Sequence, residues 1–347
     1  MTDYNELYRQ HNHRMEDFWD RRANASKYER TIHIFGQAVT FYSNHEKVLD
    51  SANIAERLYS TASPNGKPAW HVNLTVHDSD PKPAPPPERL VDLIHYAGAD
   101  DWLSIDLHGW GNCFVDMTRR EAHAILSSSL AGNPEQVSQL LLNTILTNWI
   151  TWHGYSMLHA SALIKDGHIL LLQAPHGTGK STTALRLILN GYRLLSDSMV
   201  YIGEHDGDLC MGGFPVGRIK LRSDMLPLFP ALAAQMEEEP VRNETKHRVD
   251  LKRVSPEMAY NEMIQIRRVE FCLLERREKS GSKIEPLTQD VLWPEIMVNS
   301  LHYSTSEIWH ENLRRIGLLL ERARLHRLLI GTSETEILNT VNGLWSQ

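Results

Sequence analysis

The chain has 347 residues, of which 41% are hydrophobic and 23% are charged, and its formal net charge is −7. This length allows one large domain or two modest ones, and the composition is that of an ordinary soluble globular protein. The negative charge argues against a general nucleic-acid binder or a binder of anionic membranes, because both classes carry a basic excess. We therefore expect no nucleic-acid partner and no membrane partner.

Cysteine usage and the N-terminus indicate the compartment. Cys113, Cys210 and Cys272 are scattered and show no CxxC spacing, which excludes a disulfide framework or a zinc ribbon and is typical of a reducing cytoplasm. Residues 1–6 have neither the basic nor the apolar region of a signal peptide, and no apolar stretch approaches membrane-spanning length. We expect a cytoplasmic protein.

Residues 1–27 are polar and charged, with apolar side chains spaced as on a weakly amphipathic helix, and we interpret them as a helical arm. His11 and His13 lie within this arm. Residues two apart point to different faces of a helix, so we favour a solvated arm over a metal site.

Residues 28–130 hold several short alternating runs, which include Thr31–Gly36 and Trp70–Val76. Such runs predict strands, and we interpret the region as a small strand-rich domain. The proline-rich run 81–87 predicts an extended spacer or surface loop, with a proline-recognition ligand as the less favoured alternative.

Asn133 and Pro134 predict the start of the clearest helix, because an asparagine N-cap followed by proline is a common helix start. Its wide apolar stripe continues to Ile150, and Gly154 ends it. Asp166-Gly167 then separates two apolar runs, 157–164 and 169–172, which predicts a β-hairpin.

The segment Ala174-Pro175-His176-Gly177-Thr178-Gly179-Lys180-Ser181 follows this hairpin and precedes a predicted helix that Asn190-Gly191 stops. A nucleotide phosphate loop needs a fixed order of elements along the chain: a strand, a glycine-containing turn, Gly-Lys-Ser and a helix. Backbone N–H groups and the helix N-terminus face the phosphates, the lysine reaches the outer ones, and the hydroxyl binds Mg²⁺. Ala174 replaces the first glycine of the usual pattern, G-x-x-x-x-G-K-[ST]. The residues expected to bind nucleotide are Gly177, Thr178, Gly179, Lys180, Ser181 and Thr182.

Residues 192–198 and 199–202 predict two strands after this helix. An acidic residue that ends a strand beside a phosphate loop is where such sheets hold their Mg²⁺-linked carboxylate, and Asp197 occupies this position. Residues 204–209 predict a turn. Arg218–Arg222 alternates with basic residues on one face, which fits a solvated strand or a clamp for phosphate or an acidic acceptor.

Residues 237–253 are rich in charge and predict a loop, either solvated or acting as a substrate-binding lid. A buried strand is predicted over 269–274. The C-terminal region predicts a helix, a strand over 325–330, and a last helix capped by Ser333 and Glu336.

The order of these motifs resembles that of HPr kinase/phosphorylase catalytic domains. The matching features are His159 on a strand, the Asp-Gly hairpin, the phosphate loop and Gly191–Asp197. Similarity to the HPr-kinase-related group, which includes kinases encoded beside ribosomally made peptides such as lasso peptides, rests on Phe214-Pro215, Ile219–Arg222 and Lys246-His247-Arg248 before Asp250. The resemblance covers about residues 131–347.

The resemblance implies an α/β fold, with a P-loop-containing kinase domain over 131–347 behind the small strand-rich domain. It implies ATP and Mg²⁺ as cofactors. It also implies three catalytic residues: Asp197 as the base, His159 beside the phosphates, where it helps to position them, and Lys180, which neutralises the transferring phosphoryl group. Ser181 and Asp197 would hold the metal. The implied acceptor is a hydroxyl, most simply a serine of a peptide or small protein, and a homo-oligomer is compatible with the resemblance.

One departure from the family and one from the usual phosphate-loop pattern leave alternatives open. Ser198 stands where the family has a second aspartate, so Glu204 or Asp206 is a candidate for the missing carboxylate. Ala174 and Ser198 also fit a nucleotide-binding regulatory or assembly protein that no longer transfers phosphate. An ATP-dependent carboxykinase on the same scaffold and a non-nucleotide module are further alternatives.

Overall fold

The computed structural model describes residues 26–77, 94–241, 244–300 and 305–346. The chain divides into two compact units: unit 1 comprises Met1–Glu56 and Gly66–Trp149, and unit 2 comprises Arg57–Asn65 and Ile150–Gln347. The predicted helical arm falls almost wholly outside the described residues, and the proline-rich run 81–87 falls wholly outside them. Within the described ranges, no helix is long and apolar enough to cross a membrane.

Unit 1 contains a seven-stranded mixed sheet. Its strands are β1 (Tyr28–Ile34), β2 (Gln37–Ser43), β3 (Trp70–His77), β4 (His95–Ala99), β5 (Trp102–Asp106), β6 (Gly111–Asp116) and β7 (Glu121–Ser127). They lie in the order β1-β2-β3-β7-β6-β5-β4, and β3 is parallel to both β2 and β7. The strand-rich character predicted for this region is confirmed.

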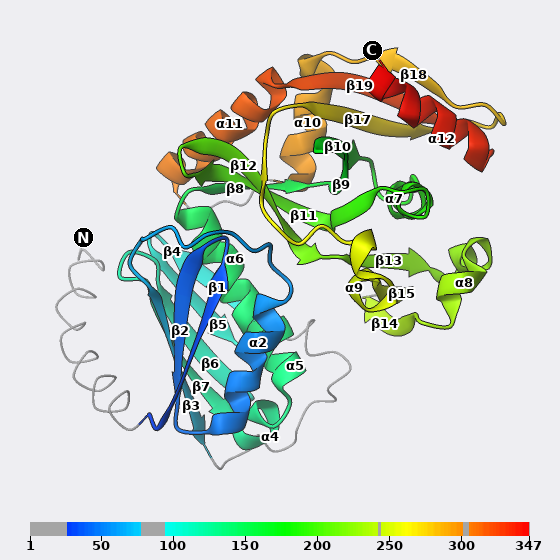
Figure 1. Cartoon of the computed structure of the whole chain (residues 1–347). Helices are drawn as coiled ribbons and strands as arrows, with labels where there is room; N and C mark the ends of the chain where they lie inside the picture. The colour runs from blue at the N-terminus through cyan, green and yellow to red at the C-terminus, as the bar shows by residue number, and fades with distance from the viewer. Residues whose placement is uncertain (1–25, 78–93, 242–243, 301–304, 347) are drawn as a thin grey trace. The chain divides into compact units, whose positions relative to one another are not determined.

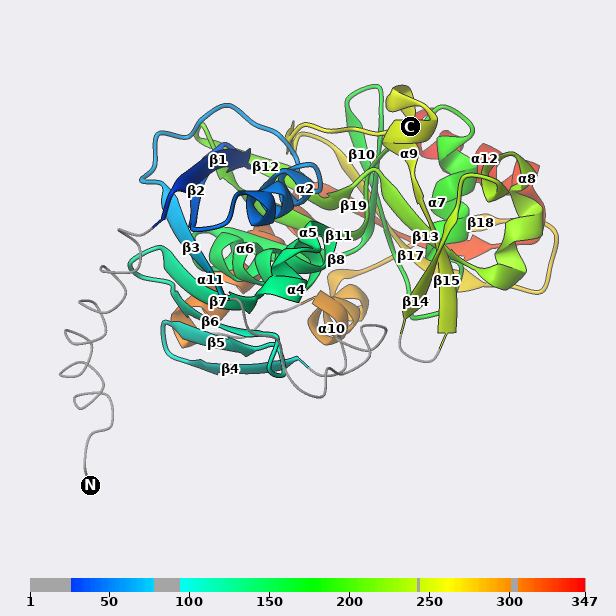
Figure 2. The same cartoon turned by 90° about the horizontal axis from the view of Figure 1, so that it is seen from below.

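Helices pack on one face of this sheet (Figures 1 and 2). They are η1 (Glu46–Leu49), α2 (Asp50–Glu56), α4 (Ser128–Ala131), α5 (Pro134–Gln136), η3 (Val137–Leu142) and α6 (Asn143–Trp152). The last three form the predicted long helix, and the Asn133 side chain caps it by accepting from the Gln136 N–H. The buried ring of Trp149 lies 5.0 Å from that of Trp70 in β3. This packing groups most of the helix with unit 1, whereas the sequence analysis assigned it to the kinase-like region.

Unit 2 contains a nine-stranded mixed sheet. Its strands are β8 (Tyr155–His159), β9 (Ser161–Lys165), β10 (His168–Gln173), β11 (Arg193–His205), β12 (Asp208–Val216), β16 (Ile264–Gln265), β17 (Val269–Arg276), β18 (Lys283–Pro286) and β19 (Ala323–Ile330). The order is β16-β12-β11-β9-β10-β17-β19-β18, with β8 also paired to β11. β17 is parallel to β10 and β19, and the Asp166-Gly167 hairpin between β9 and β10 is confirmed.

Helices cover both faces of this sheet. α7 (Lys180–Ile188) and α12 (Glu334–Asn342) pack on one face, and α10 (Gln289–Ser300) and α11 (Ser306–Glu321) pack on the other. β10 shows the consequence, because Leu170 and Leu172 pack toward α7 while Ile169 and Leu171 pack toward α10 and α11. A strand buried on both sides has an unbroken run of apolar residues, which explains the sequence before the loop that leaves β10. The molecule is thus α/β with mixed sheets.

The charged segment predicted as a loop over 237–253 is instead a β-hairpin, so that prediction is wrong. β14 (Glu237–Val241) and β15 (Glu244–Asp250) join β13 (Arg218–Arg222) in a three-stranded antiparallel sheet. Glu239 accepts from Lys220 at 2.7 Å and Glu237 accepts from Arg248 at 2.8 Å. Cross-strand ion pairs of this kind stabilise a strand whose composition alone resembles a solvated loop. Short helical segments complete the unit: η4 (Ser223–Leu228), α8 (Pro230–Ala233), α9 (Leu251–Val254), η5 (Pro256–Met258) and η6 (Gly343–Ser346).

The two strands predicted over 192–202 are one long strand, β11, with an irregularity between Ser196 and Met199. The turn predicted over 204–209 is confirmed but shorter. Asp206 and Gly207 alone form it, both in the left-handed region at φ 52° and 81°, and this conformation suits a two-residue hairpin.

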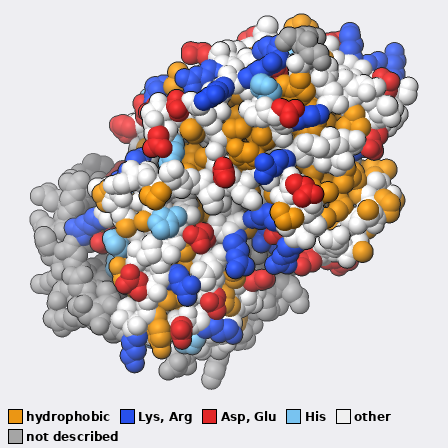
Figure 3. All heavy atoms as spheres, viewed as in Figure 1, with side chains coloured by type: hydrophobic (Ala, Val, Ile, Leu, Met, Phe, Trp, Pro, Cys, Tyr) orange, Lys and Arg blue, Asp and Glu red, His pale blue; other side chains and the backbone are white. Residues whose placement is uncertain are grey.

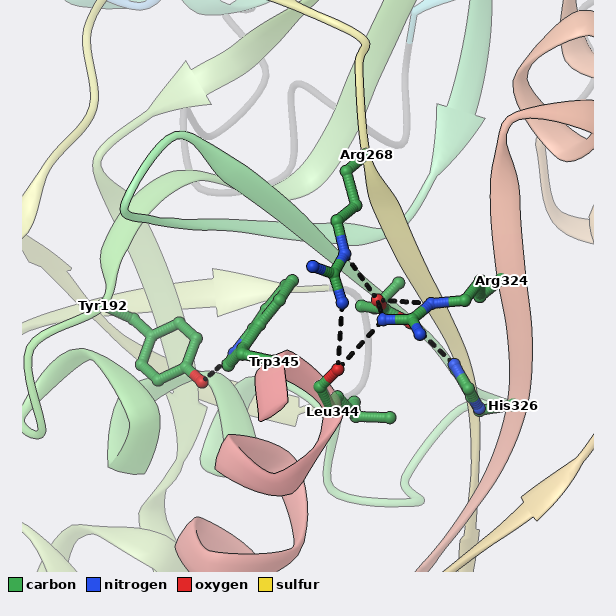
Figure 4. Close-up of polar contacts among 7 residues, drawn as sticks. Tyr192, Arg268, Arg324, His326, Leu344 and Trp345 are labelled. Carbon is green, nitrogen blue, oxygen red and sulfur yellow. Dashed lines mark hydrogen bonds and ion pairs between the residues drawn. The ribbon is translucent and has the colours of Figure 1, made fainter. Parts of the chain in front are cut away.

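A buried polar network ties the C-terminal segment to the sheet (Figure 4). Glu270 in β17 is fully buried and accepts from Arg268 at 3.3 Å and from Arg324 Nε at 2.9 Å, while His326 Nε2 lies 2.7 Å from its second oxygen. Both arginines also donate to the carbonyl of Leu344 in η6. A carboxylate this deeply buried requires such partners, and here they hold β17, β19 and η6 together.

Candidate phosphate-binding site

The loop between β10 and α7 has the backbone that a phosphate loop requires. Gly177 and Gly179 adopt φ of 80° and 108°, in the left-handed region that only glycine enters readily. No heavy atom lies within 4 Å of a Cβ built at Gly177, so this side of the loop is open. α7 begins at Lys180. The N–H groups of its first turn have no acceptor within the helix, so they are available to a ligand at the loop.

Ala174, the departure from the glycine pattern, is accommodated without strain. It is not among the described residues with positive φ, and its side chain packs against the core beneath α7. The backbone at this position therefore does not need a glycine.

Asp197 lies where β11 changes its neighbours. Up to Ser196 the strand pairs with β9, and from Met199 it pairs with β8, whose last residue His159 lies opposite Met199. The irregularity between these two registers is centred on Asp197, which is 8% exposed. The Ser161 hydroxyl donates to Oδ1 of Asp197. The break thus places a largely buried carboxylate beside the start of α7, to which Lys180 connects it.

Lys180 connects the loop to this break, because its Nζ donates to the Asp197 carbonyl oxygen at 2.9 Å. Burial lowers the pKa of Lys180, and the nearby Asp197 charge opposes that effect. Burial, and then the charges of Lys180 and His176, lower the pKa of His159 to about 4. His159 is therefore neutral near pH 7 and can act as a hydrogen-bonding group rather than as a cation.

These groups line one cavity of about 460 Å³ in unit 2. It brings together most of the predicted site residues: His159, Gly177, Gly179, Lys180, Ser181, Thr182 and Asp197. Thr178 was predicted to bind nucleotide but is not among the lining residues. The lining also includes residues that we had not assigned, among them Asp224, Met225 and Arg276.

Basic side chains outnumber acidic ones in the lining of the cavity. Six lysine and arginine residues line it (Lys180, Arg218, Lys220, Arg222, Lys246 and Arg276), against two carboxylates, Asp197 and Asp224. Several of the cations have intramolecular partners: Lys220 pairs with Glu239 at 2.7 Å and Arg222 with Asp224 at 3.2 Å. Elsewhere, on the face of the molecule shown in Figure 3, basic and acidic side chains are interspersed. The cavity is thus a local concentration of positive charge in a chain whose net charge is −7.

Glu204 and Asp206 do not supply the carboxylate that Ser198 replaces, so this expectation is corrected. Neither lines the cavity. β11 continues past the break to His205, and at about 3.3 Å per residue the stretch from Asp197 to Glu204 spans up to roughly 23 Å. There Glu204 pairs with Arg314 at 3.7 Å. Across the described part of the chain, no group of three or more His, Cys, Asp or Glu side chains could hold a metal.

Comparisons with known proteins give little further constraint. No protein-family model matches the chain, and no curated protein matches it. Among solved structures the chain is similar to the Hpr(Ser) kinase/phosphatase from Coxiella burnetii, with 16% identity, 55% of this chain and 93% of that chain covered, and a TM-score of 0.30. A likeness at this score carries no conclusion about the fold family or the activity of this chain.

Proposed function

We propose that the protein is an ATP- and Mg²⁺-dependent phosphotransferase that acts on a hydroxyl group, most simply a serine of a peptide or small protein. The observation that carries this proposal is the single cavity that joins the loop 174–181 to Asp197. Phosphoryl transfer depends mostly on positioning and charge neutralisation, so a basic cavity with one buried carboxylate contains the elements it needs.

The residues present fit a nucleoside triphosphate with Mg²⁺. The open side of the loop at Gly177 and the start of α7 at Lys180 would hold the phosphates. The Ser181 hydroxyl and one oxygen of the Asp197 carboxylate are donors of the kind that Mg²⁺ prefers, which leaves the other carboxylate oxygen for a proton, and phosphate oxygens and waters commonly complete the metal's shell. When bound, Mg²⁺ would neutralise charge on the phosphate oxygens.

Asp197 is the proposed general base. Ser161 donates to Oδ1, which leaves Oδ2 to receive the proton of the acceptor hydroxyl. The acceptor oxygen forms a bond to the γ-phosphorus while the bond from that phosphorus to the bridging oxygen breaks. Lys180 would shift from the Asp197 carbonyl toward the phosphates, and neutral His159 would donate to or accept from the groups beside them.

The peptide or small-protein acceptor is proposed from the family resemblance, and the basic residues of β13 agree with an acceptor that carries negative charge. The proposal does not depend on oligomeric state.

A direct test uses purified protein, γ-³²P-ATP, Mg²⁺ and lysate of the native cells. We expect a labelled acceptor with the wild type and with the control Lys283→Ala, whose side chain is 61% exposed outside the cavity. We expect no labelled acceptor with Lys180→Ala or Asp197→Asn. If Asp197→Asn still labels the acceptor, Asp197 is not the general base.

One observation favours a second candidate, a nucleotide-binding regulatory or assembly protein. Asp197 stands beside Ser198 rather than beside a second aspartate, and the only other carboxylate of the described cavity, Asp224, is paired with Arg222. In that case ATP binds to the wild type and to Asp197→Asn but not to Lys180→Ala, and no acceptor is labelled by any of them.

A further inference from the structure

Arg276 lies beside the phosphate loop because of the sheet topology. It is the last residue of β17, which runs parallel to β10 with Leu273 level with Gln173. Parallel strands end at the same edge of a sheet, so the residue that ends β17 reaches the loop that leaves β10. The two are close: Arg276 Nε donates to the Thr178 carbonyl oxygen at 2.9 Å.

This hydrogen bond determines the direction of one loop peptide. The bond between Thr178 and Gly179 is a planar trans peptide, so its C=O and N–H point to opposite sides. Arg276 holds the C=O on one side, and the Gly179 N–H must then point to the other. Gly179 lines the cavity whereas Thr178 does not, which agrees with an N–H that faces the cavity.

Without the arginine this orientation would be weakly determined. Gly179 is in the left-handed region at φ 108° and has wide conformational freedom, and the nearest atoms to a Cβ built on it are those of the Arg276 guanidinium, at 3.9 and 4.0 Å. Among the described residues, Arg276 is the one hydrogen-bond donor to the Thr178 carbonyl oxygen. A glycine peptide with one external hydrogen bond can rotate once that bond is lost.

We propose that Arg276 is a positioning residue that fixes the phosphate loop with the Gly179 N–H directed into the cavity, ready to bind a phosphate oxygen. The inference deepens the proposed function and rests on it for the identity of the ligand. Its essential element is a donor to the Thr178 carbonyl, not the positive charge of the guanidinium, and this distinction makes it testable.

The experiment compares Arg276→Met, which removes the donor, with Arg276→Gln, which keeps an N–H donor without the charge. Arg277→Met is the matched control, because it removes a charge at the next position. Two quantities are measured: the affinities for ATP and ADP, and amide hydrogen exchange in peptides that cover residues 175–182 of the protein alone. A thermal unfolding midpoint equal to that of the wild type shows that each variant is folded.

We expect Arg276→Met to weaken ATP and ADP binding alike, by about tenfold for one lost hydrogen bond. We also expect it to speed exchange of the loop peptides several-fold, with Arg276→Gln and Arg277→Met close to the wild type. Loop exchange unchanged in Arg276→Met overturns the inference. The inference is also overturned if Arg276→Met weakens the affinity for ATP alone, or if Arg276→Gln weakens nucleotide affinity as much as Arg276→Met does. Each result indicates that the guanidinium charge contacts the phosphates directly. If the wild type binds neither nucleotide while the exchange pattern is as expected, the proposed function fails and the loop-positioning role stands.

Discussion

Gly179→Ala, compared with a matched control, distinguishes an effect on nucleotide affinity from an effect on the free energy of unfolding. Gly179 has φ 108°, and a Cβ built there meets only the tip of the Arg276 side chain, at 3.9 Å. The substitution therefore adds backbone strain without a steric clash. Left-handed backbone costs a non-glycine residue about 1–2 kcal/mol, and this is the expected loss in the free energy of unfolding.

Gly191→Ala is the matched control at the other end of the same helix. Gly191 has φ 90° and open space where a Cβ would stand, so the expected destabilisation is the same, about 1–2 kcal/mol. Gly191 does not line the cavity. Its substitution should leave nucleotide affinity unchanged, whereas relaxation of residue 179 toward negative φ should turn the loop N–H groups away from the phosphates.

The assay combines urea unfolding with titration of a fluorescent ATP analogue. We expect both variants to lose similar stability, and only Gly179→Ala to lose affinity, by about tenfold or more. The reasoning is refuted if Gly179→Ala binds the analogue as tightly as Gly191→Ala does.

Three further predictions concern single side chains. Asp197→Asn should lower the rate of phosphoryl transfer by about 10²–10⁴-fold, since a general base contributes about that much. Nucleotide affinity measured by calorimetry without Mg²⁺ should be kept, and a transfer rate within a few-fold of wild type would contradict the assigned role. Because the folded-state pKa of His159 is about 4 and its unfolded value is near 6.5, the unfolded chain binds more protons between these values. The free energy of unfolding should therefore fall as pH drops from 6.5 toward 4, more in the wild type than in His159→Asn, and equal slopes in the two proteins would argue against a half-buried neutral imidazole. Glu270→Gln should lower the free energy of unfolding, measured by denaturant unfolding, by about 2–3 kcal/mol. This is less than for a fully buried ion pair because Arg268 and Arg324 are partly exposed. A change as small as that for a surface glutamate would show that the network does not stabilise the fold.

Much of the site could be predicted from sequence because its signals are local. The apolar run of β10, the two glycines and the start of α7 lie within about twenty residues, and each has a conformational preference that the structure shows. Asp197 was singled out because an acidic residue was expected to end a strand close to the loop, although the strand in fact continues through it to His205.

The remaining features depend on contacts between distant segments. Arg276 reaches the loop only because β17 pairs with β10, about a hundred residues earlier, and no local pattern marks it. β14 was predicted as a loop because its sequence is rich in glutamate. The cations that pair with these glutamates lie on β13 and β15, and the local sequence does not reveal them. Glu204 was considered for the metal site because it is near Asp197 in sequence, but an extended strand separates the two in space.

The central claim is that the cavity at the loop 174–181 binds the phosphates of a nucleotide. Isothermal titration of ATP with Mg²⁺ into wild type, Lys180→Ala and the exposed-lysine control Lys283→Ala tests it most directly. We predict equal affinities for the wild type and Lys283→Ala, and binding at least about tenfold weaker for Lys180→Ala, since that lysine supplies a charge-assisted contact to the phosphates. ATP that binds Lys180→Ala as tightly as the wild type, or no binding to the folded wild type, would contradict the account.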